Sequence, residues 1–216
     1  SYSVTGVQTC ALPIFITEKE QPSFRSFYPE KGFYRAKPAT GDHEVIIIKD
    51  HNLSLVTLPK TVMAEMLEVI RGRYLDMKEK KGVASIMPIY NHGADAGASI
   101  SHPHAQIFAS GIVANTVGRE LDGAERYYGI NGTCVFCDIV NHEIKERVRI
   151  VAENDNFLAA TFFASRFPLE TWIYPKKHES QFENTPKSHL EDLADVMVDL
   201  FESLENNIPN VPLNFF

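Results

Sequence analysis

The sequence predicts an α+β fold made of two related halves, each an antiparallel sheet with a long amphipathic helix. Two helix patterns and a weak repeat support this prediction. Apolar residues recur at three- and four-residue intervals over residues 60–80 and again over residues 187–206, as in helices that bury one face. In both halves a strand pattern ends in a short bridge and a histidine, His51 or His178, and a loop and the long helix follow.

The shorter elements can be read in chain order. Residues 15–40 are rich in Phe, Tyr, Pro and Lys without clear periodicity, which is typical of loops with short extended pieces. A weaker helix pattern covers residues 117–128. Apolar and β-branched runs predict strands. These runs are residues 44–48, 84–90, 106–110, 147–152, 157–162, 170–174 and 209–216.

The chain divides into three expected segments. Residues 1–14 are expected to be non-native, because residues 4–14 resemble one reading frame of a common sequencing adapter. Residues 15–130 are expected to form the first half and residues 131–216 an incomplete second half. By the repeat, a counterpart of the first half's His-Pro-His would lie beyond the last residue, so we expect both natural termini to be missing.

Composition excludes several classes of protein. The 216 residues include 21 Lys and Arg against 28 Asp and Glu, for a net charge of −7. No basic cluster is present, which argues against binding a nucleic-acid polymer. No apolar run reaches the roughly 18 residues that a spanning helix needs, so no membrane partner is expected.

The most informative stretch runs from Asn91 to Gln106 (NHGADAGASISHPHAQ). On a strand, His102, His104 and Gln106 would share one face. The preceding loop contains Gly93 and Gly97, which allow close backbone approach to a phosphate, and Ser99 and Gln106 can donate hydrogen bonds without adding charge. A neutral imidazole can attack phosphorus if an acceptor holds its other nitrogen. Histidines that only bind metal, or lie satisfied in the core, are the alternative.

Cys134 and Cys137 form a Cys-x-x-Cys pair. That spacing is typical of a metal site or of a redox pair. His178 is a plausible third ligand, although spacing alone does not select it. Cys10 lies in the segment expected to be non-native and is discounted.

These motifs resemble the galactose-1-phosphate uridylyltransferase branch of the histidine-triad superfamily. The resemblance runs from about residue 41 to residue 216 and rests on HEVII, NHGADAGAS, HPHAQ, CVFC and PKKH. It implies a histidine-triad-like fold with His104 as the nucleophile. Gln106 would hold a phosphate oxygen, and Asn91, Gly97 and Ser99 would help to position the phosphates.

The resemblance also implies Zn²⁺. One site would use Cys134, Cys137 and His178, with a fourth histidine that lies beyond this chain. The other would use His51 and His102 with two upstream cysteines that this chain lacks. The metal at this second-named site would be structural and would orient the strand that carries His104.

The expected function is nucleotidyl transfer between a nucleoside diphosphate sugar and a sugar 1-phosphate through a nucleotidyl-histidine, with UDP-glucose and galactose 1-phosphate as the leading pair. The alternatives are an ADP-glucose:phosphate adenylyltransferase (a phosphorylase), a histidine-triad hydrolase and a zinc-stabilised domain without activity. A cytoplasmic homodimer is the family expectation. The remaining histidines are interpreted as structural or solvated, with His92 near enough to the loop to approach a ligand. They are His43, His92, His142 and His189.

Overall fold

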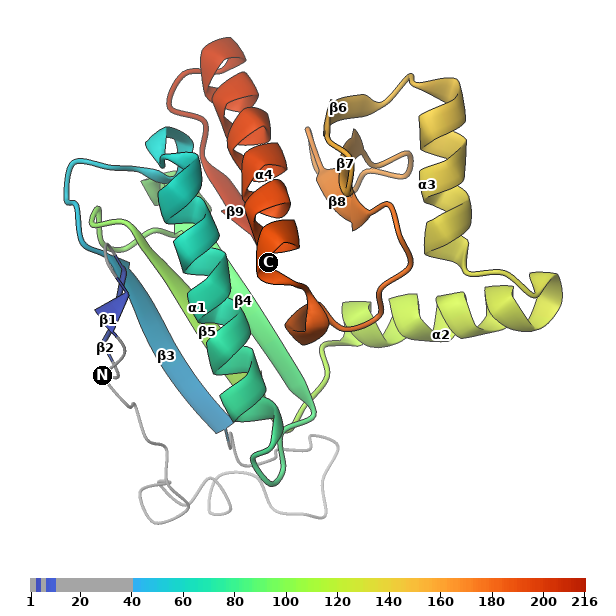
Figure 1. The fold of residues 1–216 in the computed structure, drawn as a ribbon, viewed down its shortest axis with the longest axis horizontal. Coiled ribbons are helices and arrows are strands. Elements are labelled where there is room, and N and C mark those ends of the chain that lie inside the picture. The colour runs from blue at the N-terminus through green and yellow to red at the C-terminus, as the bar shows by residue number, and fades with distance from the viewer. Residues whose placement is uncertain (1–2, 5–6, 11–40) are drawn as a thin grey trace, which may run out of the picture.

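The computed structural model describes residues 3–4, 7–10 and 41–216. Within these residues, strands and helices form one large antiparallel sheet, one small antiparallel sheet and four α-helices (Figure 1). The α+β class with antiparallel sheets and long helices is confirmed. The predicted loop over residues 15–40 lies outside the described residues.

The large sheet has the strand order β1-β2-β3-β5-β4-β9. The first two strands, β1 and β2, lie within residues 1–14, and β2 pairs with β3. That residues 1–14 are non-native stays a prediction. The strands are β1 (Ser3–Val4), β2 (Val7–Cys10), β3 (Gly41–Ile48), β5 (His104–Ser110), β4 (Ser85–His92) and β9 (Leu213–Phe215).

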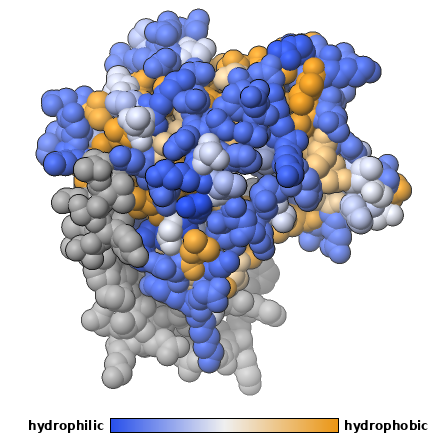
Figure 2. All heavy atoms as spheres, viewed as in Figure 1, coloured by the Kyte–Doolittle hydropathy of each residue, from blue (hydrophilic) through white to orange (hydrophobic). Residues whose placement is uncertain are grey.

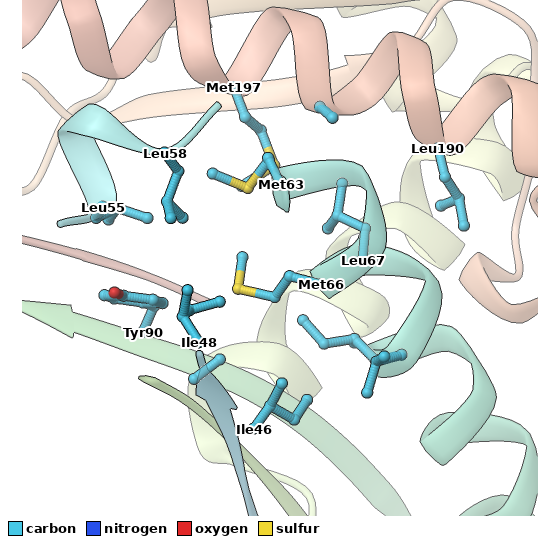
Figure 3. Close-up of a cluster of buried hydrophobic side chains, with 14 of the residues drawn as sticks. Ile46, Ile48, Leu55, Leu58, Met63, Met66, Leu67, Tyr90, Leu190 and Met197 are labelled. Carbon is cyan, nitrogen blue, oxygen red and sulfur yellow. The ribbon is translucent and has the colours of Figure 1, made fainter. Parts of the chain in front are cut away.

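Helices α1 (Lys60–Lys78) and α4 (Lys187–Asn207) lie side by side over one face of this sheet (Figure 1). Both helices match the predicted ranges closely. Their apolar faces meet the sheet in one cluster that includes Ile46, Met66 and Met197 (Figure 3). The face of the molecule over these helices is mainly hydrophilic (Figure 2), as expected for amphipathic helices at a surface.

The second half of the chain packs directly against the first half and does not form a separate domain. Helix α4 packs against α1, and β9 extends the first half's sheet by pairing with β4. The reason is visible along α4, where Leu190 and Met197 face the large cluster while Val196 packs against Phe157 and Ala159 of the small sheet. Because one helix serves both sheets, the two halves share their packing.

The small sheet has the order β6-β7-β8. Its strands are β6 (Ile150–Glu153), β7 (Phe157–Thr161) and β8 (Thr171–Pro175). Helix α2 (Asn115–Asn131) projects from the large sheet and leads to α3 (Val135–Glu146), which lies beside the small sheet (Figure 1). The sequence pattern does not predict α3. The expected boundary between the halves falls at the end of α2 and stays a prediction.

Candidate active site and metal centre

His104 is the first residue of β5 and pairs with Ile47 of β3. Along β5, Ala105, Ile107 and Ala109 are buried in the core, so the alternation of a strand places His104 and Gln106 together on the opposite face. The core side of β5 therefore fixes which way the site residues point.

The orientation of the His104 ring is fixed by a backbone carbonyl two residues earlier in the chain. Its Nδ1 lies 2.8 Å from the carbonyl oxygen of His102. A carbonyl oxygen only accepts hydrogen bonds, so Nδ1 must carry the proton. In the neutral ring, Nε2 is then unprotonated and has its lone pair available as a nucleophile.

A cleft of about 290 Å³ opens in front of this ring. It brings together three residues predicted from the sequence, Asn91, His102 and His104. Its lining does not include the other three predicted binding residues, Gly97, Ser99 and Gln106. The lining residues are Ser54, Tyr90, Asn91, His92, Gly93, Ala94, Ala98, Ile100, Ser101, His102, Pro103 and His104.

The loop after β4 is a tight turn that uses its own amides. The N–H groups of Ala96 and Ala98 donate to the Gly93 carbonyl, and the N–H of Gly97 donates to the Ala94 carbonyl. Gly93 and Gly97 have φ values of 83° and 85°, which favour glycine. The glycines therefore shape the turn, and the amides of Ala96, Gly97 and Ala98 are engaged within it.

Asn91 is fixed by a residue that the sequence analysis did not single out. Asn214 of β9 donates from Nδ2 to Asn91 Oδ1 at 2.6 Å and to the carbonyl of Ala96 at 2.8 Å. One side chain thus ties the loop to Asn91. With its oxygen occupied, Asn91 presents its amide nitrogen as the remaining donor. Only the long-range pairing of β4 with β9 reveals this contact.

His92 also lines the cleft. Burial lowers its pKa, although Glu205 acts in the opposite direction. The ring is therefore mainly neutral near pH 7, and it can donate or accept a hydrogen bond without adding positive charge.

His102 lies just before β5, so it does not share the regular strand with His104 as expected. Its Nε2 donates to the carbonyl of Ile48 at 2.7 Å, and its ring centroid lies 4.3 Å from that of His51. The two predicted ligands are therefore adjacent, with Nδ1 of His102 left as the donor atom for a metal. The contact holds the segment before His104 against the end of β3.

Cys134, Cys137 and His178 come together as predicted. Their ligand atoms all lie within 4.8 Å of one another, and Cys137 Sγ lies 3.2 Å from His178 Nδ1. In the described part of the chain this is the one group of three or more such residues placed to hold a metal ion. Two thiolates and an imidazole are a typical soft donor set, so the residues fit a metal ion.

The local structure favours metal binding over redox exchange. The pair lies between α2 and α3, with Cys134 directly before α3 and Cys137 in its first turn, and not between a strand and a helix as in thioredoxin-like folds. Burial, together with Cys134, raises the pKa of the Cys137 thiol, whereas redox-active cysteines carry a lowered pKa.

Comparisons with known proteins identify the chains that this one resembles. Residues 16–114 match the family model "Galactose-1-phosphate uridyl transferase, N-terminal domain". The galactose-1-phosphate uridylyltransferase of Thermotoga maritima is 31% identical over 186 residues, covering 83% of this chain and 58% of that protein. The ADP-glucose phosphorylase of Arabidopsis thaliana is 29% identical over 192 residues, covering 88% of this chain and 53% of that protein.

Solved structures give the same picture. A uridylyltransferase structure superposes with a TM-score of 0.78 at 27% identity, covering 85% of this chain and 59% of that one. The Arabidopsis ADP-glucose phosphorylase with bound ADP-glucose gives 0.74 at 28% identity, covering 81% and 55%. The chain spans just over half the length of these relatives. The chain is therefore similar to galactose-1-phosphate uridylyltransferases, and residues 16–114 match the model of their N-terminal domain.

Proposed function

We propose that this chain transfers a nucleoside monophosphate from a nucleoside diphosphate sugar to a sugar 1-phosphate through a covalent intermediate on His104. The observation that carries the proposal is the hydrogen bond from Nδ1 of His104 to the His102 carbonyl, which leaves Nε2 as the nucleophile beside an open cleft. UDP-glucose and galactose 1-phosphate are the leading substrate pair, in line with the names of the uridylyltransferase relatives.

In the first step, Nε2 of His104 attacks the α-phosphorus of UDP-glucose. A phosphorus–nitrogen bond forms, the bond from that phosphorus to the bridging oxygen breaks, and glucose 1-phosphate leaves with the bonding electrons. The attached ring carries a positive charge, which the His102 carbonyl stabilises through Nδ1–H. This arrangement makes the backbone of His102 part of the machinery without any proton transfer.

In the second step, a phosphate oxygen of galactose 1-phosphate attacks the same phosphorus. The phosphorus–nitrogen bond breaks, UDP-galactose forms and His104 returns to its neutral state. Both steps develop negative charge on the non-bridging phosphate oxygens, where positioned donors contribute most to catalysis. Asn91, Ser99 and Gln106 are the proposed donors. Of these, Asn91 lines the cleft, and Gly97 forms the turn between Asn91 and Ser99.

The second candidate is transfer of AMP from ADP-glucose to phosphate. It is favoured by the Arabidopsis ADP-glucose phosphorylase, whose similarity covers 88% of this chain. The chemistry at His104 is the same, and only the base and the final acceptor differ. A hydrolase would use water as that acceptor.

We further propose that the Cys134–Cys137–His178 site holds zinc. In a tetrahedral zinc site with Zn–S bonds of about 2.3 Å, ligand atoms lie roughly 3.5–3.8 Å apart, a spacing compatible with the cluster. The ion would join the start of α3 to the segment after β8 and would supply no chemistry at His104. Elemental analysis of the chain and of Cys134→Ser tests this site. The resemblance also supports a cytoplasmic homodimer, and sedimentation of the purified chain tests its subunit number.

Incubation with UDP-glucose or ADP-glucose labelled in the nucleoside tests the function. We expect one sugar nucleotide to label the chain, His104→Ala to abolish labelling, and His142→Ala, on the exposed side of α3, to label normally. Release of the label by galactose 1-phosphate, by phosphate or by water alone separates the transferase, the phosphorylase and the hydrolase. Absence of labelling with both nucleotides would favour a domain without activity.

A further inference from the structure

Gln106 has a partner on the neighbouring strand. Strand β3 pairs with β5 in a register that places Val45 opposite Gln106 and His43 opposite Phe108. His43 reaches diagonally across this pair, and its Nε2 lies 3.0 Å from Oε1 of Gln106. From the sequence alone, His43 is interpreted as a structural or solvated residue.

A second contact, with Phe108, fixes the plane of the His43 ring. It stacks on Phe108, with ring centroids 4.0 Å apart and an interplanar angle of 12°. Because Phe108 lies two residues after Gln106 on the same face of β5, the ring has one fixed position relative to the carboxamide. Nε2 therefore approaches Gln106 from a set direction.

The chemistry of the two groups sets the direction of the carboxamide. The carboxamide oxygen only accepts hydrogen bonds, so Nε2 of His43 must carry a hydrogen in this contact. With its oxygen engaged by His43, Gln106 has its amino group as the remaining free end. An anionic phosphate needs a donor, and a carboxamide turned the other way would present an oxygen that repels it.

We propose that His43 is a positioning residue that holds the Gln106 carboxamide with its amino group available to a phosphate oxygen of the nucleotide. This inference rests on the proposed function, because it assigns a partner to a residue of that site. His43 does not touch the reacting atoms and acts through Gln106 alone. The strand pair β3–β5 thus supplies both the nucleophile and an oriented donor.

The test uses variants that separate stacking from hydrogen bonding. His43→Phe keeps an aromatic ring against Phe108 and removes the donor, whereas His43→Gln keeps an N–H donor. We expect His43→Phe to slow nucleotidyl transfer to His104 by roughly three- to ten-fold, the effect of one hydrogen bond, and His43→Gln to recover part of the rate. His142→Phe, the same exchange at an exposed position, should leave the rate unchanged.

A double-mutant cycle decides whether the effect passes through Gln106. In a Gln106→Ala background, adding His43→Phe should change the transfer rate little. A wild-type rate in His43→Phe, or an equal slowing in both backgrounds, would overturn the inference.

Nuclear magnetic resonance keeps this test apart from the test of the function. The side-chain amide signals of Gln106 should shift when UDP-glucose or ADP-glucose is added to the wild type and lose this response in His43→Phe. If the chain is not labelled by either nucleotide, the proposed function fails, and the positioning role is still decided by this response. A response that His43→Phe leaves unaltered contradicts it.

Discussion

The region around His104 and the region around the two cysteines are held together by different means. Strands β3, β4 and β5 pack with α1 and α4 around one large apolar cluster. The small sheet and α3 share a much smaller cluster centred on Val140, Leu158 and Tyr174. This second region adds polar links, such as Arg149 with the buried Glu143, and three side chains placed to hold a metal ion.

The difference indicates where each site obtains its rigidity. His104 is oriented by strand pairing and by a backbone carbonyl, both supported by the large core. Cys134 and Cys137 lie at the start of α3 and His178 follows β8, and these two segments share only the small cluster around Val140, Leu158 and Tyr174. We infer that the fold alone orients His104, whereas the order of the Cys134–Cys137–His178 cluster depends on a bound metal ion.

Metal removal should have the largest effect on this contrast. Chelation should speed hydrogen exchange in α3 and around His178 and leave exchange in β5 slow. The expected effect is large because a metal ion at a thousand times its dissociation constant adds about 4 kcal/mol to the free energy of unfolding of the region that it binds. Hydrogen exchange of α3 amides compared with β5 amides measures this. Cys137→Ser should reproduce the effect without chelator, and equal loosening of both regions would contradict the contrast.

Truncation of a core side chain should destabilise a different part of the molecule in each of the two regions. Ile107 and Leu158 are both fully buried, and replacing either with alanine should cost about 3 kcal/mol. Ile107→Ala should lower the free energy of global unfolding measured in urea. Leu158→Ala should raise hydrogen exchange mainly in α3 and β6–β8. Uniform exchange in both variants would show that the regions unfold as one.

Asn214→Ala should weaken substrate binding without affecting the metal site. The variant loses the hydrogen bonds to Asn91 and Ala96, worth ~1 kcal/mol, so calorimetry should show nucleotide binding weakened roughly five-fold. Asn207→Ala, at the exposed end of α4, is the matched control. Unchanged binding in Asn214→Ala would remove Asn214 from the site.

The smallest expected effect concerns acid stability of the second region. Hydrogen bonds from the Trp172 indole and from Arg166 lower the pKa of Glu170 to about 2. A carboxylate whose pKa is lower in the folded state than in the unfolded state stabilises the fold in its charged form. This stabilisation is fully present when the pH is above the unfolded-state pKa of about 4.3, and it is lost as the pH falls toward the folded-state pKa of about 2. Because Arg166 is half exposed, the contribution should be ~1 kcal/mol or less.

Urea denaturation of the wild type and Glu170→Gln between pH 7 and pH 3 measures this contribution. The wild type should be more stable at pH 7, and the difference should shrink below pH 5. A difference that grows on acidification would have the wrong sign for a carboxylate stabilised in its charged form.

Much of the fold could be predicted because its periodic elements are long. The two long helices and the strands at β3, β5, β7 and β8 follow directly from apolar spacing. Helix α3 was missed because its apolar residues, Phe136, Ile139 and Val140, form too short a pattern beside the cysteines. Their burial depends on the small sheet, which lies later in the chain.

From the residues alone the site was predictable where they form short motifs, whereas His178 and His51 were assigned to metal sites through the family resemblance. His102, His104 and Gln106 form one motif, and Cys134 and Cys137 form another. Asn214 and His43 contact their partners across 123 and 63 positions, a distance over which sequence spacing carries no information. Strand register, which depends on the packed sheet, brings these residues into place.

Mass spectrometry of the chain after brief exposure to UDP-glucose or ADP-glucose tests the central claim most directly. We expect a peptide heavier by one nucleotidyl group, with the modification on the His104 ring and absent from His104→Ala. A nucleotidyl group on another residue, or an unmodified chain that still exchanges sugar phosphates, would contradict it.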